Sequence, residues 1–206
     1  MRLTLLGTGT PTPSIRRTSS SYLIETGGDL ILFDTGPGSY FRYLQTGRSL
    51  TDLTHIVYSH FHYDHCADFA PIALARWDQG GGAIDDLNVI GPNHVHEFVT
   101  TMMGDNGAFA PDQDARTRHD ASLGYYRARG GKGERARIAP VTHALKSGDT
   151  YDGNGWTLRC IEVPHVQPHL SCLAFRLDAE GQSFCYSGDA SLSKPFMRLA
   201  TDCDIL

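Results

Sequence analysis

The sequence predicts a layered α/β fold. Short strand-like runs alternate with helix-like segments along most of the chain, and no segment repeats with a fixed period. The chain has 206 residues, 40% of them hydrophobic and 20% charged, which is the composition of a globular protein with enough length for one sizeable core. We therefore expect residues 1–206 to form a single domain.

Strands dominate the first part of the chain. Three short apolar runs are bounded by Gly, Pro, Thr or Asp, and Gly27-Gly28-Asp29 has the composition of a hairpin turn between the second and the third. After a short aromatic-rich helix, a buried strand leads directly into a cluster of histidines and then into a longer helix. The expected strands are 3–6, 20–25, 30–33 and 55–58, and the expected helices are 39–45 and 64–77.

The second part of the chain continues this pattern after one interruption. Residues 104–136 are poor in aliphatic side chains, and seven Arg or Lys side chains lie in or next to this segment, opposed by few acids. We expect a basic insertion here, either an ordinary surface excursion or a lid that brings positive charge to an anionic substrate. Around it we expect strands at 87–90, 138–143, 156–163, 171–177 and 183–187, helices at 93–103 and 191–200, and the start of a last strand at 203–206.

Charge and cysteine usage exclude several classes of protein. Lys and Arg number 18 against 23 Asp and Glu, and the resulting net charge of −5 argues against a surface that coats nucleic acid. No apolar run is long enough to cross a membrane, and the apolar start of the chain is too short for a signal peptide. The five cysteines are scattered and lack a CxxC spacing, which favours a reduced, cytoplasmic setting.

One segment, His60-Phe61-His62-Tyr63-Asp64-His65, carries most of the candidate chemistry and directly follows a buried strand. Residues two apart in an extended backbone face the same way, so His60 and His62 can chelate one ion. Asp64 and His65 lie at the start of the following helix and can bind a second ion beside the first. Imidazole and carboxylate ligands suit zinc, with manganese or iron as alternatives. We interpret the cluster as a metal site, because composition alone rarely produces it.

Two single residues are weaker candidates for the same site. His165 closes one strand-like run and Asp189 ends another, and each alone is compatible with a structural role at a strand end, in a turn or in a helix cap. Because open α/β sheets gather functional side chains at strand ends, we count both as candidate ligands. His169 is an alternative ligand to His165. We prefer His165, because it ends the strand directly. Cys66, next to the cluster, is expected to be a packing residue rather than a ligand or nucleophile.

These motifs together resemble the metallo-β-lactamase superfamily, in particular its ribonuclease Z-like and arylsulfatase-like branch. The resemblance covers nearly the whole chain, and the histidine cluster matches the family signature HxHxDH in full. It rests on five elements in the family's order, which are residues 5–13, Phe33-Asp34-Thr35-Gly36, the HFHYDH cluster, His165 and Ser187-Gly188-Asp189.

The resemblance implies a four-layer αββα sandwich with two zinc ions at one edge. By the family pattern, His60, His62 and His165 hold one ion, Asp64 and His65 hold the other, and Asp189 bridges them. Asp34 then supports the site by orienting the ligand loop through hydrogen bonds. A hydroxide shared by the two ions would attack a phosphodiester, sulfate ester, carboxylic ester or lactone, and Asp64 is the candidate catalytic residue that accepts a hydrogen bond from it. The group that protonates the leaving group is left open among His94, His96, His119, His143 and His169.

The sequence departs from the family in two places. The long tRNA-gripping arm of bacterial ribonuclease Z proteins is absent, because only residues 166–188 separate the third histidine motif from Asp189. No histidine follows Asp189, whereas the family has a last metal-binding histidine there, so we expect the sandwich to be C-terminally incomplete. A chain that stops in this way exposes the edge of a buried strand, which favours association into a homo-oligomer.

Three hypotheses about function follow. A binuclear metallohydrolase acting on a small anionic or ester substrate is favoured. A ribonuclease Z-like tRNA 3′-processing endonuclease is the alternative within the enzyme class, although the acidic net charge and the missing arm make a nucleic-acid partner the weaker choice. A non-catalytic metal-binding or interaction protein is the third, because the last family histidine is missing. The fold by itself does not choose the substrate.

Overall fold

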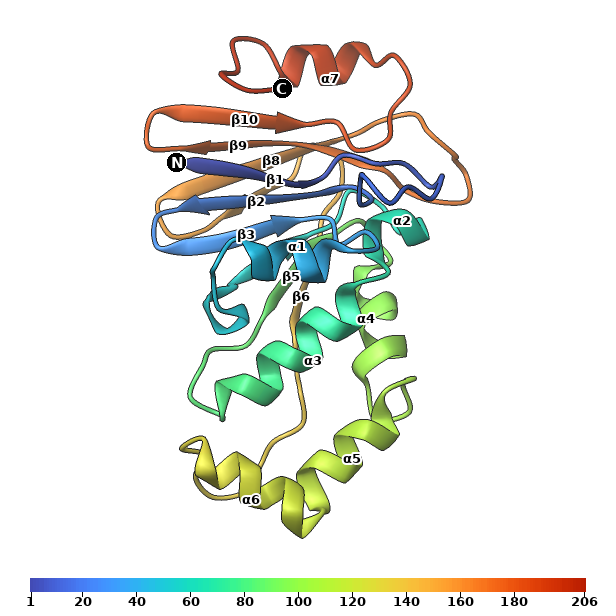
Figure 1. Cartoon of the computed structure of the whole chain (residues 1–206). Helices are drawn as coiled ribbons and strands as arrows, with labels where there is room; N and C mark the ends of the chain where they lie inside the picture. Colours follow the sequence, from blue (N-terminus) through green and yellow to red (C-terminus); the bar gives the residue numbers. More distant parts are fainter.

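Two β-sheets pack face to face in the computed structural model, which describes residues 1–206 (Figure 1). The first sheet has the order β1-β2-β3-β4-β5-β6 and consists of β1 Arg2–Gly7, β2 Ser21–Thr26, β3 Asp29–Phe33, β4 His55–Val57, β5 Asn88–Gly91 and β6 Val141–Ala144. The second has the order β10-β9-β8-β7 and consists of β7 Thr150–Asp152, β8 Trp156–Glu162, β9 Leu173–Ala179 and β10 Gln182–Tyr186. Strands β1 to β3 are antiparallel, whereas β3 to β6 run parallel.

Helices cover the outer faces of both sheets, which gives the αββα layers that the resemblance implies. Over the first sheet lie α1 Ser39–Gln45, α3 Phe69–Gly80 and α4 Val95–Met103, and the short α2 Tyr63–Cys66 lies at the sheet's edge (Figure 1). The outer face of the second sheet carries α7 Lys194–Leu199, and a 3₁₀ turn, Leu50–Asp52, precedes β4. No helix has the length and apolar character needed to span a lipid bilayer.

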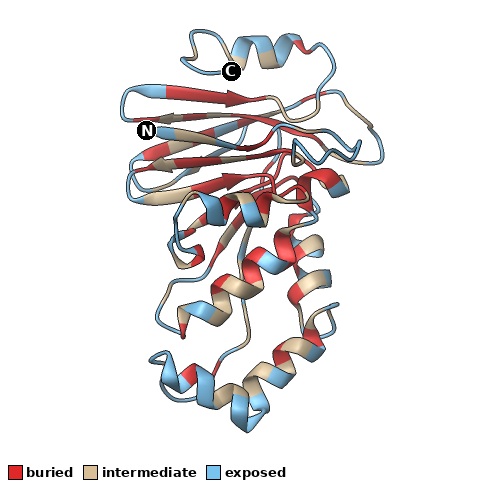
Figure 2. Ribbon diagram, viewed as in Figure 1, coloured by how far each residue is buried: buried red, intermediate tan, exposed pale blue.

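The alternation of side chains along β2 and β3 divides the core into two layers. Leu23 and Leu32 face the helices, whereas Ile24, Ile31 and Phe33 face the second sheet. The ring of Phe33 meets those of three residues from the second sheet edge-on, with centroids 6.1, 5.5 and 6.1 Å away. Figure 2 shows that the strands of the sandwich are largely buried. Burial of a side chain such as Phe33 contributes about 1.5–3 kcal/mol, so packing between the sheets fixes the end of β3.

The helix expected over 64–77 is instead two helices, α2 and α3, and the single-helix prediction was wrong. The Asp68 carboxylate accepts hydrogen bonds from the backbone N–H groups of Gly38 and Tyr40, at 2.9 and 3.0 Å. The carbonyl of His65 accepts another from the N–H of Thr35, at 2.7 Å. These contacts with the turn before α1 draw the backbone out of the helical path between α2 and α3.

Residues 104–136, which we expected to be a surface excursion or a lid, are mostly helical. They contain α5 Ala110–Arg118 and α6 Asp120–Ala128. Arg116, Arg129 and Arg135 find a partner outside this segment, because all three reach the carboxylate of Asp78 in α3, at 3.0, 2.5 and 2.7 Å. Both helices lie beyond α3, at the end of the molecule away from α2, so their position lends no support to a lid (Figure 1).

Two smaller differences concern the strands of the second half. β7 has no counterpart among the predicted elements. The strand expected to begin at 203–206 is reduced to one parallel bridge between Ile205 and Phe184 of β10. β7 is short and largely exposed, so the apolar run that signals a strand is absent from it.

Candidate metal centre

The turn after β3 provides the support of the site. Asp34 follows β3 directly, is fully buried, and has a φ of 52°, a left-handed conformation that Asp and Asn tolerate better than most residues. Its carboxylate accepts four hydrogen bonds, from the backbone N–H and hydroxyl of Ser59 (both 2.8 Å), from Nδ1 of His65 (2.6 Å) and from the hydroxyl of Tyr186 (2.5 Å). One buried anion thus ties together segments from both sheets.

The histidine cluster begins where β4 ends. Because β4 is parallel to β3, its carboxyl end opens at the same edge as the turn containing Asp34. Nδ1 of His62 lies 2.9 Å from Nε2 of His60 and 3.2 Å from Nε2 of His165. Three imidazole nitrogens therefore converge on one point. Zinc–nitrogen bonds of 2.0–2.1 Å in a tetrahedron place ligand nitrogens about 3.3 Å apart, so this spacing suits a zinc ion.

A second ligand group lies beside the first. Nε2 of His65 is 3.5 Å from Oδ2 of Asp64 and 3.4 Å from Oδ1 of Asp189. Oδ2 of Asp64 is buried and has no hydrogen-bond partner. A buried carboxylate oxygen without a partner is costly, and a cation between these three side chains would satisfy it. The donor set therefore fits a second ion.

Asp189 belongs to both groups. It lies within 4.8 Å of His60, His62 and His165 and equally of Asp64 and His65. Its side chain is 41% exposed, which leaves the shared position open to solvent and to a substrate. The structure thus brings together all six residues that the sequence singled out as metal ligands.

Burial and the neighbouring charge act in the same direction on the pKa of His60 and in opposite directions on the pKa of His65. Burial, together with the neighbouring His65, lowers the pKa of His60 to about 4, which favours the neutral imidazole that binds metals. Burial alone would lower the pKa of His65 as well, but hydrogen bonds and Coulombic attraction from Asp189 and Asp34 outweigh it and raise this pKa to about 10. The hydrogen bond with His65 in turn lowers the pKa of Asp189 to about 2.

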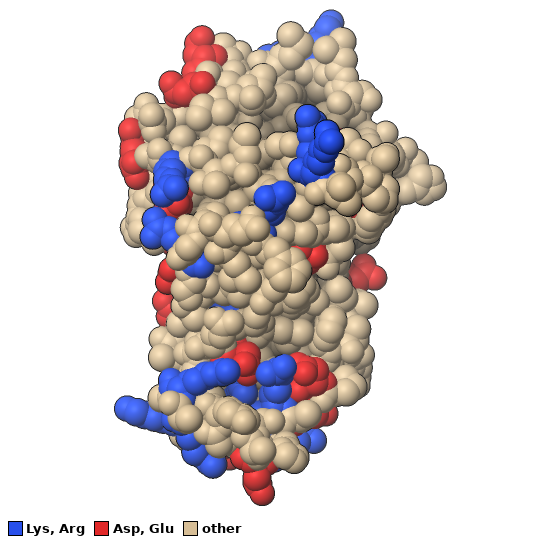
Figure 3. Space-filling model, in the orientation of Figure 1, with Lys and Arg blue, Asp and Glu red and all other residues tan.

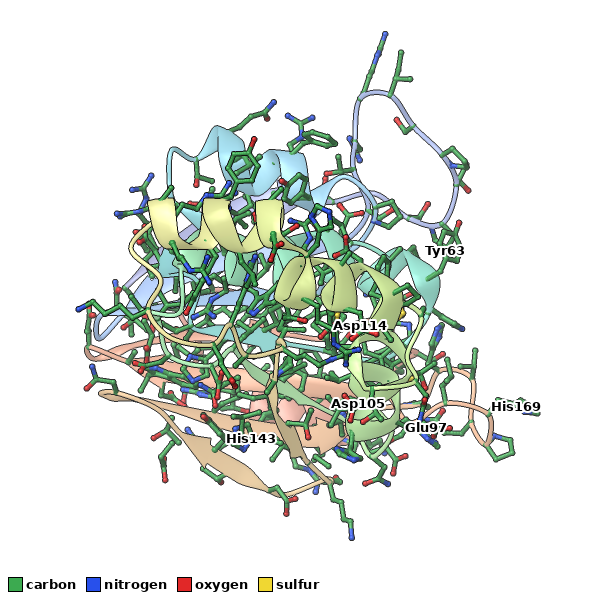
Figure 4. The ribbon with its side chains drawn as sticks, turned by 90° about the horizontal axis from the view of Figure 1, so that it is seen from below. Tyr63, Glu97, Asp105, Asp114, His143 and His169 are labelled. Carbon is green, nitrogen blue, oxygen red and sulfur yellow. The ribbon has the colours of Figure 1, made fainter.

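Of the two histidines considered for the first ligand group, only His165 belongs to it. His165 is half-buried and contributes Nε2 to the first group, whereas His169 is exposed and points outward at the end of its loop (Figure 4). None of the five histidines considered as proton donors belongs to either ligand group. Three of them bond elsewhere: His94 with Glu97, His96 with Thr142 and His143 with Asn88.

Cys66 is a packing residue, as expected. It is buried in the cluster between the first sheet and its helices, and its thiol donates to the carbonyl of His62 at 3.2 Å. Burial raises the pKa of this thiol to about 12, so it remains protonated and a poor ligand.

Sequence reasoning missed several residues that shape the site. Ser59 and Tyr186 hold the Asp34 carboxylate, and both lie next to motifs that the sequence did reveal. Gly36 and Gly188 allow close approach: a Cβ on Gly36 would lie 2.1 Å from the carbonyl oxygen of Asp64, and one on Gly188 would lie 2.7 Å from Cβ of Ser59. Only contacts between distant segments show these roles.

A two-sheet sandwich with histidine and aspartate ligands at the strand ends defines a class of metal-dependent hydrolase folds. The sequence model of the metallo-β-lactamase superfamily matches residues 15–204, and the chain belongs to this superfamily.

Two relatives named ribonuclease Z are similar to this chain over most of its length. A ribonuclease Z of Mycobacterium sp. (strain KMS) is 30% identical over 190 residues, which cover 92% of this chain but 61% of that protein, so the chain spans about three fifths of this relative's length. A ribonuclease Z of Mycobacterium bovis (strain BCG / Pasteur 1173P2) is 28% identical over 208 residues, which cover 100% of this chain and 69% of that protein.

Solved structures share the fold. The metallo-β-lactamase fold protein YhfI from Bacillus subtilis aligns with a TM-score of 0.70 and 18% identity, covering 98% of this chain and 68% of that one. The short form of human tRNase Z aligns with a TM-score of 0.68 and 17% identity, covering 98% and 75%. At these identities the similarity establishes the architecture only.

Proposed function

We propose that this protein is a metal-dependent hydrolase that binds two metal ions and cleaves a phosphodiester bond. The observation that carries the proposal is that Asp189 belongs to two ligand groups, because a carboxylate between two ligand sets is what a two-ion site requires. The relatives named ribonuclease Z support a phosphodiester over a sulfate ester, carboxylic ester or lactone.

Two zinc ions, or manganese or iron in their place, would activate a water molecule and stabilise the charge that develops on the phosphate oxygens. His60, His62 and His165 would hold one ion, Asp64 and His65 the other, with Asp189 between them. With an ion bound, the Asp34 carboxylate would accept the Nδ1 proton of His65 and leave the Nε2 lone pair for the ion. Asp64 is also the residue we propose to accept a hydrogen bond from the attacking water.

Metal content and turnover test the proposal together. We expect two equivalents of metal per chain, and hydrolysis of bis-p-nitrophenyl phosphate in preference to p-nitrophenyl sulfate and p-nitrophenyl acetate. Chelation should abolish this turnover and zinc should restore it. His60→Ala should reduce the rate at least about a hundredfold. Asp189→Asn changes a half-exposed residue and serves as a second variant if His60→Ala fails to fold.

The matched control is His94→Ala, which removes an exposed histidine whose ring contacts Glu97 at 3.2 Å. Absence of stoichiometric metal, or wild-type rates in both ligand variants, would overturn the proposal. Stoichiometric metal without turnover of any ester would favour the non-catalytic hypothesis instead.

RNA is the second candidate substrate, favoured by the ribonuclease Z relatives. Cleavage of a precursor tRNA, with a gel shift at low salt, tests it, and failure to bind would exclude it. We further propose a cytoplasmic location, supported by five free cysteines of which four are buried. Association into a homo-oligomer also remains a prediction, and measuring the molar mass by light scattering would test it.

A further inference from the structure

A groove lined by arginines lies beside β1, outside both ligand groups. Its volume is about 570 Å³, and its charged lining residues are Arg2, Arg16, Arg17 and Arg42. No Asp or Glu lines this arginine groove, and most of its remaining lining is threonine, glutamine and glycine. Four cations without an acid are unexpected in a chain whose net charge is −5.

Three separate segments build the arginine groove. Arg2 lies on the same face of β1 as Leu6, which packs toward the helices, and α1 packs against this strand. Arg42 comes from the last turn of α1, and Arg16 and Arg17 come from the loop between β1 and β2. Figure 3 shows basic side chains spread over this face of the molecule. The first acidic residue of the chain is Glu25, so the whole segment before it is free of negative charge.

The arginines of the groove differ from the other arginines in their partners. Arg16, Arg17 and Arg42 form no ion pair, and Arg2 reaches Glu25 only at 3.6 Å. Most arginines near α5 and α6, with the exception of Arg127, are instead held by Asp78 and other carboxylates. Unpaired guanidinium groups in a concave surface repel one another and concentrate positive potential, which an anion would neutralise.

The loop that carries Arg16 and Arg17 also borders the metal centre. It is closed by a hydrogen bond from the N–H of Gly9 to the carbonyl of Thr18 at 2.7 Å. The hydroxyl of Tyr63 donates to the carbonyl of Pro11 in the same loop at 2.8 Å, and Tyr63 directly precedes the candidate ligand Asp64. The loop therefore links the arginine groove, at Arg16 and Arg17, to the segment that carries the candidate ligand Asp64.

The geometry points to the arginine groove as a binding site for a ligand with several phosphate groups. The planar guanidinium group bonds phosphate oxygens in pairs, and four such groups from three separate segments of the groove can bond more than one phosphate group. We further infer that this ligand is the substrate and that its phosphate groups in the arginine groove lie away from the bond that is cleaved. Only this part of the inference rests on the proposed function. Binding in the groove itself needs no metal ion.

Two probes separate the sources of the phosphate groups: adenosine 3′,5′-bisphosphate and a fluorescent 2′-O-methyl oligoribonucleotide that resists cleavage. We expect Arg16→Gln/Arg17→Gln to weaken binding of at least one probe about tenfold or more. For the oligonucleotide, the slope of log K against log salt should fall by about 1.4, since each phosphate contact on a single strand contributes about 0.7. Both arginines are exposed, so the variant should fold.

The matched control is Arg127→Gln/Arg198→Gln, which removes the same charge from two exposed arginines without ion pairs elsewhere on the molecule. An equal loss of affinity in this control, or no binding of either probe to the wild type, would overturn the inference. Binding of the bisphosphate alone supports a small ligand, and binding of the oligonucleotide alone supports a nucleic acid. Asp189→Asn should keep groove binding while losing hydrolysis. If the wild type binds a probe but hydrolyses nothing, the proposed function fails and the groove stands.

Discussion

Replacing Asp34 by asparagine changes one oxygen of a buried carboxylate into an amide nitrogen and keeps the size of the side chain. Asparagine also tolerates the left-handed φ of 52° at this position, so the backbone should not resist the change. The variant therefore isolates the hydrogen bonds of the anion. Oδ2 of Asp34 accepts from the Ser59 hydroxyl, from Nδ1 of His65 and from the Tyr186 hydroxyl, at 2.8, 2.6 and 2.5 Å.

An amide nitrogen at this position cannot accept. The two hydroxyl groups can rotate and accept from it, but the imidazole of His65 can accept from it only when Nδ1 has no proton, and the neutral ring then carries its proton on Nε2. If the amide is turned the other way, its nitrogen faces the backbone N–H of Ser59, which then has no acceptor. Either arrangement breaks a buried charged network, which costs about 3–5 kcal/mol.

Urea denaturation of the metal-free protein measures this loss. With a slope of about 2 kcal/mol per molar urea, the midpoint should fall by roughly 1.5 to 2.5 M. Metal titration measures the second consequence, because a proton on Nε2 prevents His65 from binding an ion. We expect the affinity for one of two ions to fall about 10- to 100-fold.

The matched control is Asp202→Asn. Asp202 has a φ of 54° but is exposed and makes no side-chain hydrogen bond, so the free energy of unfolding should change by less than about 0.5 kcal/mol. An Asp34→Asn protein that unfolds like this control and binds both ions with unchanged affinity would refute the reasoning.

Four further changes have expected outcomes. Gly36→Ala should lower the free energy of unfolding by more than about 2 kcal/mol, because the added Cβ would lie 2.1 Å from the backbone carbonyl oxygen of Asp64 in α2. Gly124→Ala is the control: its Cβ would have nothing within 4 Å, so the change should be neutral or stabilising. Thermal denaturation compares the two variants. Partial burial of Asp78 is outweighed by hydrogen bonds and charges from the neighbouring arginines, which lower its pKa to about 2. Its ion pairs therefore stabilise the fold above about pH 4, and this stabilisation is lost as the pH falls toward 2. The denaturation midpoint of the wild type should decline over this range, whereas that of Asp78→Asn should lack this decline. Arg135→Lys should cost about 1–3 kcal/mol in urea denaturation, since lysine cannot both pair with this carboxylate and stack at 4.1 Å on the neighbouring indole; an unchanged midpoint would contradict this. Zinc at a hundredfold excess over its Kd should stabilise the protein by about 2.7 kcal/mol per site in a thermal shift, and His60→Ala should lose the contribution of its site.

Most strands and helices were predictable because their signals are local. The alternation of side chains in β2 and β3 and the turn at Gly27-Gly28-Asp29 depend on neighbouring residues only. The break between α2 and α3 was not predictable in this way, because it depends on hydrogen bonds that Asp68 makes about 30 residues back in the chain. The helices in 104–136 lack a strong apolar stripe and owe part of their order to Asp78 and Trp77 of α3.

By itself, the sequence determined the types of the candidate ligands, their close spacing in His60–His65, and the family to which the chain belongs. These features are contiguous or follow the period of a strand, so they can be read without the fold. Only the tertiary structure brought His165 to His62 across 103 residues and Tyr186 to Asp34 across 152, because those contacts arise from packing one sheet on the other. Tertiary packing also decided which arginines are paired: it placed a carboxylate beside Arg129 and Arg135 and none beside Arg16, Arg17 and Arg42.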